Sequence, residues 1–259
     1  MKTTALITGA SNGIGLELAK IHASKGGDLV LVARNKSKLD QLKAELENQY
    51  KVSVYTIGKD LSATESAQEV YDEINEQNIQ IDYLINNAGF GGYGMFAETD
   101  WNTELNMIHL NITALTLFTK LFLNDMVKRR SGKIMNVAST AAFQPGPTMA
   151  VYCATKAFVL SFTEAVSNEA HDKGVSITAL CPGATETGFQ EAAGLDDSKL
   201  FKGKKLPNAK QVAEFGYRSM IKGKTVAVHG MMNYILANSI RFIPRAIVLK
   251  VSRKILDKA

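Results

Sequence analysis

A glycine-rich turn near the N-terminus constrains the fold of this chain more than any other feature. Residues 3–8 form a short apolar run typical of a buried strand, and Gly9-Ala-Ser-Asn-Gly13-Ile-Gly15 follows at once. Ile14, Leu18 and Ile21 then recur at helical spacing. Glycines let the backbone turn tightly, and a helix N-terminus offers free N–H groups to an anion. Strand, glycine turn and helix in this order therefore predict a dinucleotide-binding unit.

Short apolar runs continue to alternate with segments of helical periodicity along the chain. Strands are expected at 29–33, 52–57, 81–85, 133–137, 175–180 and 226–228, and helices at 36–49, 62–77, 99–130 (in two pieces) and 150–172. Such alternation favours a parallel sheet covered on both faces, and 259 residues suffice for one large core. We predict a single α/β, doubly wound Rossmann-type domain with a seven-stranded sheet at 1–230, extended by a C-terminal helical segment at 231–259.

Cysteine and histidine usage gives no sign of disulfides or of a metal site. Cys153 and Cys181 provide no disulfide framework, and the four histidines are scattered without metal-ligand spacing. This usage fits a reducing compartment, and no run of 18 uncharged apolar residues occurs. We therefore expect a cytoplasmic protein.

The net charge of +5 is concentrated in the C-terminal tail. Residues 239–259 hold six basic residues and one acidic residue, whereas residues 1–238 hold 24 of each sign. The body of the chain carries no basic stripe with interleaved aromatic residues, so a nucleic acid is not an expected partner.

Residues with useful chemistry directly follow the predicted strands. Arg34, Asn86-Asn-Ala-Gly89, Ser139 and Pro182-Gly183 each stand just beyond a strand. Ligands of open α/β sheets bind beyond the carboxyl ends of the strands, so we expect these residues to converge on one edge. The irregular connection at 185–206 is expected to act as a lid over this edge, with a merely exposed connection as the alternative.

Arg34 bears on the choice of cofactor. About twenty residues after the glycines, an NAD site usually places a carboxylate on the ribose 2′-hydroxyl. Here Ala33, Arg34 and Asn35 stand in its place. A guanidinium can grip a 2′-phosphate, which favours NADP, although a solvated arginine at a strand end is the alternative.

Tyr152 and Lys156 form a candidate acid/base pair. On a helix, residues four apart have Cβ atoms about 5–6 Å apart, and a nearby ammonium lowers the pKa of a phenol. The same spacing recurs at Tyr55 and Lys59, but that pair lies on a predicted strand and would be separated by about 13 Å. The helical setting and Ser139 at the preceding strand end distinguish the candidate pair.

Together these residues resemble the short-chain dehydrogenase/reductase family over about residues 3–230. The resemblance rests on Thr8-Gly9-x-x-x-Gly13-x-Gly15, Asp60, Asn86-Asn-Ala-Gly89, Asn111, Ser139, Tyr152-x-x-x-Lys156 and Pro182-Gly183, in family order. It implies an NADPH-dependent oxidoreductase, a carbonyl reductase or alcohol dehydrogenase, that acts on a small-molecule ketone or alcohol. It also implies a homodimer or homotetramer.

The resemblance further implies roles for single residues. Tyr152 would exchange a proton with the substrate oxygen, Ser139 would hydrogen-bond the same oxygen, and Lys156 would bind the nicotinamide ribose. Asn111 would hold a water molecule that links Lys156 to solvent. Thr185 stands where Val or Ile is usual, but its expected contact is through the backbone. Cofactor contacts are expected from Gly9, Ser11, Asn12, Gly13, Ile14, Gly15, Arg34, Asp60, Leu61, Asn87, Ala88, Gly89, Tyr152, Lys156, Pro182, Gly183, Thr185 and Thr187.

The C-terminal tail has a composition of its own. Pro244 can open a helix at 244–257, with one apolar face of Ile247, Val248, Val251 and Ile255 and with Lys250, Arg253 and Lys254 together elsewhere. Such a helix packs on the domain or on a second subunit, or it lies on a membrane surface, for which a basic amphipathic helix is typical. A membrane contact would suit an apolar substrate, as would the apolar residues near the site: Phe90, Tyr93, Met95, Phe96, Phe143, Met149 and Phe189.

Two other classes of function remain open. A catalytically silent NADP-binding sensor would keep the glycines and lose the catalytic set, whereas Asn111, Ser139, Tyr152 and Lys156 are all present. A membrane-peripheral scaffold would depend mainly on the tail. The intact catalytic set favours an enzyme.

Overall fold

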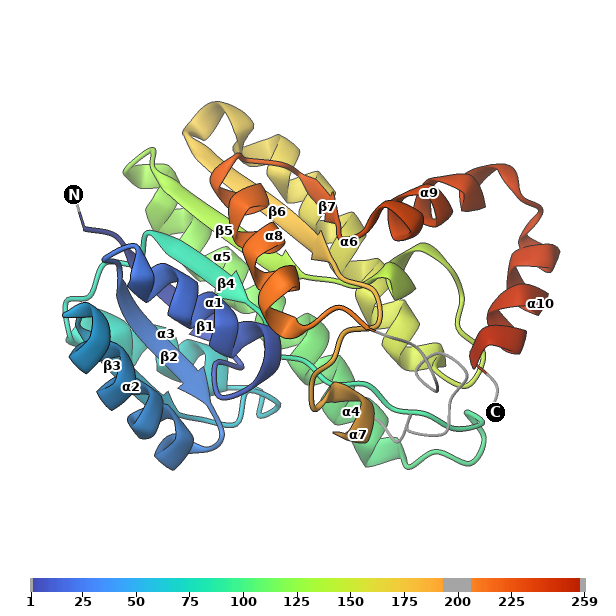
Figure 1. The fold of residues 1–259 in the computed structure, drawn as a ribbon, viewed down its shortest axis with the longest axis horizontal. Helices are drawn as coiled ribbons and strands as arrows, with labels where there is room; N and C mark the ends of the chain where they lie inside the picture. The colour runs from blue at the N-terminus through green and yellow to red at the C-terminus, as the bar shows by residue number, and fades with distance from the viewer. Residues whose placement is uncertain (1, 193–205, 257–259) are drawn as a thin grey trace.

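The computed structural model describes residues 2–192 and 206–256 (Figure 1). Within these residues, seven parallel strands form one sheet in the order β3-β2-β1-β4-β5-β6-β7. The strands are β1 (Thr4–Thr8), β2 (Asp28–Ala33), β3 (Val54–Gly58), β4 (Tyr83–Asn86), β5 (Gly132–Val137), β6 (Val175–Cys181) and β7 (Val226–Val228). The strand order reverses between β1 and β4, the place where a doubly wound sheet opens its ligand crevice.

Helices cover both faces of the sheet. They are α1 (Gly13–Ser24), α2 (Lys36–Tyr50), α3 (Ser66–Glu76), α4 (Trp101–Ile108), π-helical η1 (His109–Ala114), α5 (Leu115–Lys128), α6 (Ala150–Ala170), α7 (Phe189–Ala192), α8 (Ala209–Ile221), α9 (Met231–Ser239) and α10 (Arg245–Leu256), with short 3-10 turns η2 (Thr140–Phe143), η3 (His171–Lys173) and η4 (Ile240–Phe242). Helices α1, α2 and α8 share a core with one face, and α3, α5 and part of α6 share a core with the other (Figure 1).

The strands are buried on both faces because successive side chains pack into the two cores on opposite sides of the sheet. In β1, Ile7 packs into the core under α1, α2 and α8, whereas Leu6 packs into the core under α3 and α5. Both side chains are fully buried. Burying such a side chain stabilises the fold by about 1.5–3 kcal/mol, so a continuous apolar run is favoured at this position.

The predicted fold class is confirmed, with differences in detail. Strand β3 begins at Val54, two residues later than expected. The two helical pieces expected at 99–130 are joined without a break through the π-helical turn η1. Helices α7, α8 and α9 were not predicted. No helix in residues 2–192 or 206–256 is both long and apolar enough to cross a membrane.

Candidate active site

A cavity of about 630 Å³ opens along the carboxyl ends of the strands. Every predicted site residue lines it except Gly15 and Asn111, which lie behind its wall. The residues that lie apart in the sequence thus converge as expected: Arg34 after β2, Asn87 after β4, Ser139 after β5 and Pro182 after β6. The predicted lid is outside the described residues between 193 and 205, while Thr185 and Thr187 at its start belong to the cavity wall.

The glycine turn is packed so closely that side chains are excluded from it. Gly9 and Gly13 have φ angles of +67° and +55°, which favour glycine. A Cβ atom on Gly15 would lie 2.4 Å from the Gly9 carbonyl oxygen and 2.5 Å from Asn87 Nδ2. Thr8 Oγ1 accepts hydrogen bonds of 3.0 Å from both Asn87 N and Ala88 N. These contacts bring the ends of β1 and β4 together and place the α1 N-terminus at the cavity.

One end of the cavity is rich in cations, and its described lining holds one carboxylate, Asp60, which is exposed. Ser11, Arg34, Lys38 and Lys59 line this end together with Asp60. Burial opposes ionisation of Asp60, but hydrogen bonds from Ser62 N and Ser62 Oγ, with the charge of Arg34, hold its pKa below the usual value. Asp60 is therefore an acceptor at neutral pH, beside donors suited to a phosphate.

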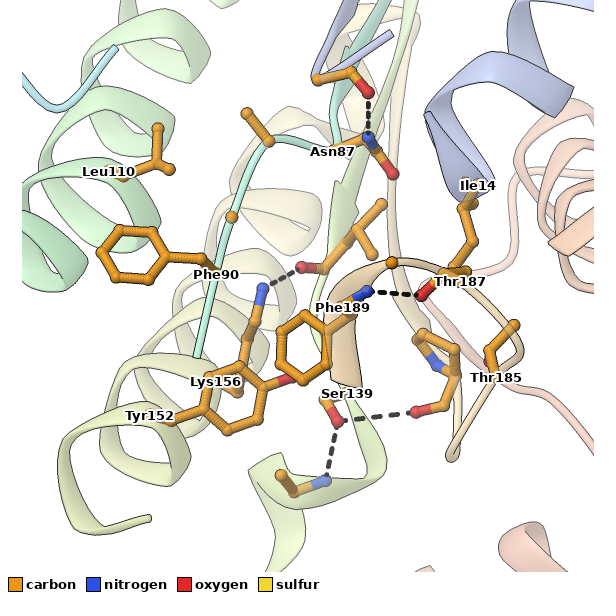
Figure 2. A pocket seen from close by; sticks show the side chains of 18 of the residues that line it. Ile14, Asn87, Phe90, Leu110, Ser139, Tyr152, Lys156, Thr185, Thr187 and Phe189 are labelled. Atoms are coloured by element: carbon orange, nitrogen blue, oxygen red, sulfur yellow. Dashed lines mark hydrogen bonds between the residues drawn. The ribbon is translucent and has the colours of Figure 1, made fainter. Parts of the chain in front are cut away.

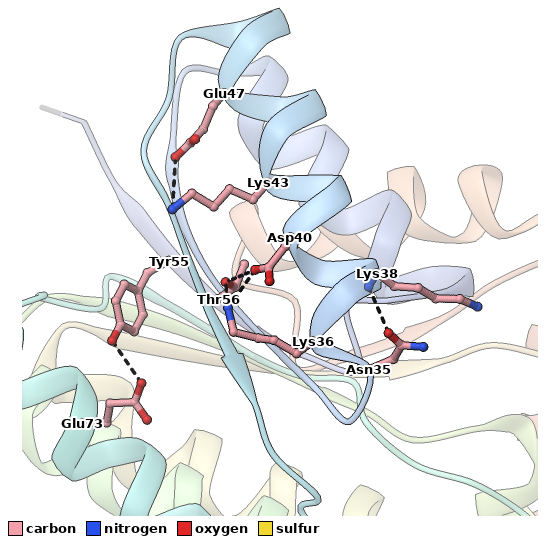
Figure 3. Close-up of polar contacts among 9 residues, drawn as sticks. All are labelled: Asn35, Lys36, Lys38, Asp40, Lys43, Glu47, Tyr55, Thr56 and Glu73. Carbon is pink, nitrogen blue, oxygen red and sulfur yellow. Dashed lines mark hydrogen bonds and ion pairs between the residues drawn. The ribbon is translucent and has the colours of Figure 1, made fainter.

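The second Tyr–Lys spacing, Tyr55 and Lys59, does not form a pair, and Figure 3 shows the contact that Tyr55 makes instead. Tyr55 Oη donates to Glu73 Oε1 at 3.0 Å, and Lys59 Nζ pairs with Glu69 at 2.8 Å. The two side chains thus engage different carboxylates, as the strand geometry predicted. Lys36 on α2 is likewise held by Asp40 at 2.7 Å and does not line the cavity.

Tyr152, Lys156 and Ser139 meet on the floor of the cavity (Figure 2). Tyr152 and Lys156 project from successive turns of α6, with Lys156 Nζ 5.9 Å from the centre of the Tyr152 ring. Lys156 Nζ donates to the Val137 carbonyl oxygen at 2.8 Å, which ties α6 to the end of β5. Ser139 Oγ accepts from Ala141 N at 3.0 Å, and this bond orients the hydroxyl. Lys156 Nζ and Ser139 Oγ are thus positioned by backbone groups of β5 and of η2.

The pKa values of this pair are governed by burial. Burial raises the pKa of Tyr152 to about 12, against an opposing hydrogen bond with Ser139. Burial also lowers the pKa of Lys156 to about 8. In the protein by itself, loss of hydration dominates the pKa of Tyr152, so the lowering expected from Lys156 stays a prediction for the protein with its cofactor bound. At neutral pH the phenol is protonated, which is the state that donates a proton.

Asn111 acts from behind the wall, in the π-helical turn η1. Its Nδ2 donates to the Phe90 carbonyl at 3.0 Å and to Thr155 Oγ1 at 3.1 Å, and its Oδ1 accepts from Phe90 N at 3.2 Å. A Cβ atom on Gly89 would lie 2.9 Å from Asn111 Oδ1 and 3.4 Å from Lys156 Nζ. Asn111 therefore fixes the backbone that follows β4, which lies in front of Lys156. The π-helical turn η1 directs the Asn111 side chain toward this backbone.

Apolar groups form the remaining wall around the phenol. The Phe189 ring lies 5.3 Å from the Tyr152 ring, and Gly91 leaves room for both. Phe90 and Met149 also line the cavity. Of the other apolar residues expected near the site, Tyr93 packs behind this wall, Phe143 packs in another core cluster, and Met95 and Phe96 are exposed.

Comparison with known proteins identifies the family. The family described as short chain dehydrogenase matches this chain over residues 3–198. The chain belongs to that family. It is 30% identical over 262 residues to the very-long-chain 3-oxoacyl-CoA reductase of Homo sapiens, covering 96% of this chain and 79% of the relative.

Two solved structures are similar along nearly all of this short-chain dehydrogenase. A short-chain dehydrogenase from Sphingobium yanoikuyae in complex with NADPH superposes with a TM-score of 0.83 at 32% identity, covering 93% of this chain and 94% of that one. The bulky-bulky ketone specific alcohol dehydrogenase from Comamonas testosteroni gives 0.79 at 29% identity, covering 93% and 92%. This protein is accordingly an oxidoreductase with the fold of a nicotinamide dinucleotide enzyme.

One wall of the cavity in this short-chain dehydrogenase was not predicted from the sequence. Ser252, Ile255 and Leu256 of α10 line the cavity, and Tyr93 Oη donates to the Leu256 carbonyl at 2.9 Å. Cys153 is buried and also lines the cavity. The apolar periodicity of 244–257 was visible in the sequence, but nothing in it showed where the helix would dock.

Proposed function

We propose that this short-chain dehydrogenase uses NADPH to reduce the carbonyl group of a bulky apolar ketone. The observation that carries the proposal is Tyr152. Its protonated phenol faces a cavity whose nearby wall consists of Phe189, Met149 and Leu256. A buried acid beside apolar walls suits proton delivery to a carbonyl oxygen whose carbon bears large apolar groups.

The residues of the cavity fit a dinucleotide. The closely packed glycines leave open the α1 N-terminus, where a pyrophosphate would bind. Asp60 and the Leu61 backbone would hold the adenine, and Arg34 and Ser11 would hold a 2′-phosphate. Lys156 would bind the ribose next to the nicotinamide, and the backbone of Thr185 and the hydroxyl of Thr187 would bind the carboxamide or pyrophosphate. The bound cofactor supplies the hydride.

The protein's own residues provide orientation and the proton. Ser139 hydrogen-bonds the carbonyl oxygen and stabilises the negative charge that develops on it. Tyr152 gives its phenolic proton to that oxygen as the carbonyl carbon accepts the hydride, so the product is a neutral alcohol. The resulting phenolate is stabilised by Lys156, and Asn111 aligns the path by which the proton is replaced.

The apolar lining supports a bulky substrate class. The relatives that share this fold are named for a 3-oxoacyl-CoA and for a bulky-bulky ketone, and both substrates carry a ketone between two substituents. Gln144 and Ser252 are uncharged polar residues that also line the cavity. We therefore propose a long-chain or polycyclic ketone in preference to a sugar.

Tyr152→Phe tests the acid. We expect this variant to lose at least 1,000-fold in kcat while the Kd for NADPH changes less than threefold, because only the proton donor is removed. NADPH oxidation should be followed across aryl ketones, steroid ketones, 3-oxoacyl thioesters and sugars, with binding followed by fluorescence. If the variant keeps more than a tenth of the wild-type rate, Tyr152 is not the acid. If the wild type reduces only polar aldoses, the substrate class is wrong.

A further inference from the structure

Large apolar side chains are exposed along the last part of the described chain. Eleven of the sixteen exposed large apolar residues in the described ranges fall between 231 and 256. The most exposed are Phe242 at 87%, Met231 at 77% and Met232 at 68%. We call the exposed side chains of residues 231–256 the C-terminal surface. Apolar patches of this extent on soluble proteins mark sites of interaction.

The domain itself covers little of this segment. Helix α9 buries Ala237, and α10 buries only a narrow stripe of Val248, Ser252 and Leu256. Figure 1 shows both helices at the edge of the molecule, outside the layers that cover the sheet. The apolar side chains on their outer faces therefore do not belong to the core of the domain.

Cations accompany these apolar groups. Arg241, Arg245, Lys250, Arg253 and Lys254 lie between residues 231 and 256, and the sequence has no Asp or Glu in that interval. A dimer formed symmetrically through this surface would set these cations against their own copies, which is unfavourable. An anionic lipid surface complements both the charge and the apolar groups, and each cation near it contributes about 1 kcal/mol. We propose that the C-terminal surface docks this enzyme on an anionic membrane.

One stripe of this surface leads directly into the cavity. Ile247, Val251 and Ile255 recur every four residues on α10 and are 52%, 52% and 42% exposed. Ile255 also lines the cavity beside Leu256. An apolar ketone dissolved in the bilayer would thus meet continuous apolar side chains from the lipid to Tyr152. This consequence rests on the proposed reductase function, whereas the docking itself does not.

Sedimentation with lipid vesicles tests the docking in the full-length protein. We expect binding to vesicles of phosphatidylcholine with one fifth phosphatidylserine, and at least tenfold weaker binding to pure phosphatidylcholine. The double variants Met231→Ser/Phe242→Ser and Lys250→Glu/Lys254→Glu should each weaken binding to the anionic vesicles at least tenfold. Each should still reduce a water-soluble ketone at the wild-type rate, since none of the four residues lines the cavity.

Matched variants elsewhere on the surface provide the controls. Ile221→Ser removes an exposed apolar side chain at the end of α8, and Lys222→Glu/Lys224→Glu reverses two exposed charges beside it. These variants should bind the anionic vesicles like the wild type. Equal weakening by control and test variants would overturn the proposal, because general charge would then explain the binding.

A second copy of the chain is the competing occupant. Light scattering should show the same oligomeric state for the wild type and for Met231→Ser/Phe242→Ser. Loss of an oligomer in this variant, with no vesicle binding by the wild type, would show that a second copy covers the surface and would overturn the proposal. Failure of the reductase proposal would be seen separately, as absence of turnover with soluble ketones.

Discussion

Lys156 carries a charge that the surrounding protein disfavours. Burial lowers its pKa to about 8, compared with about 10.4 for a lysine in water. The folded protein therefore binds this proton less tightly than the unfolded chain does. Stability rises with pH between about 8 and 10.4, because the folded protein has released this proton there while the unfolded chain still binds it; the full penalty is present below pH 8.

Lys156→Met should separate stability from activity. At pH 7 we expect the free energy of unfolding of the variant to be about 2 kcal/mol higher than that of the wild type. Removal of the buried charge stabilises the fold by more than loss of the hydrogen bond to Val137 destabilises it. This advantage should vanish by about pH 10.4, and ketone reduction should be lost at every pH. Urea denaturation at pH 7 and pH 10 measures the difference. Lys210→Met, at an exposed position, should show no such pH dependence. A gain in stability that persists at pH 10 would rule out the charge as its cause.

Arg34 should decide between the two dinucleotides. We expect Arg34→Ala to raise the Kd for NADPH about 10- to 100-fold and to leave the Kd for NADH within threefold, because charged hydrogen bonds to the 2′-phosphate contribute about 1.5–3 kcal/mol. Lys36→Ala is the matched control, since Lys36 is held by Asp40 outside the cavity. Calorimetric titration of each cofactor measures the change. Equal loss of affinity for both cofactors would show that Arg34 does not read the phosphate.

At the scale of elements, close packing joins β1, α1 and β4. Gly15 does not line the cavity, but its lack of a side chain lets the α1 N-terminus approach the Gly9 carbonyl. Helix α1 begins with Asn12 Oδ1 accepting from Gly13 N at 2.8 Å. The close approach of Gly15 to the Gly9 carbonyl, behind the cavity wall, thus sets the position of the proposed pyrophosphate site.

Gly15→Ala should damage both stability and cofactor binding. The new Cβ atom meets backbone at 2.4 Å, so the turn must shift, and we expect the free energy of unfolding to fall by at least about 2 kcal/mol and NADPH affinity to fall at least tenfold. Gly26→Ala adds its Cβ where no atom lies within 4 Å, although its φ of +78° is strained. It should cost about 1 kcal/mol and leave NADPH affinity unchanged. If the two variants behave alike, close packing at Gly15 is not the cause.

Elements with strong local signals could be predicted from the sequence, and elements placed by distant contacts could not. The apolar composition of residues 3–8 is enough to predict a buried strand. The residues that follow each strand converge because the carboxyl ends of parallel strands lie at one edge of the sheet. The π-helical turn at Asn111 depends on contacts to Phe90 and Thr155, 21 and 44 residues away. The docking of α10 likewise depends on Tyr93, 163 residues away. Burial of Tyr152, which raises its pKa, follows from such packing.

At the scale of the whole molecule, the sequence division at residue 230 remains a prediction. The sheet is complete when β7 ends at Val228, yet Ser252 and Leu256 return to the cavity beside Tyr152. The residues proposed to bind the dinucleotide and to donate the proton thus lie before residue 230, whereas one wall of the cavity belongs to the extension. A homodimer or homotetramer and a cytoplasmic location also stay predictions.

The central place of β1 has a consequence for synthesis of the chain. β1 pairs with β2 on one side, but its other partner, β4, begins 75 residues after β1 ends. On the ribosome, β1, β2 and β3 can associate while one edge of the buried strand β1 still has no neighbour. Unpaired edges of this kind recruit strands from other chains. Slow translation before Tyr83 would therefore expose nascent chains to aggregation, and chaperone binding would be most useful during that interval.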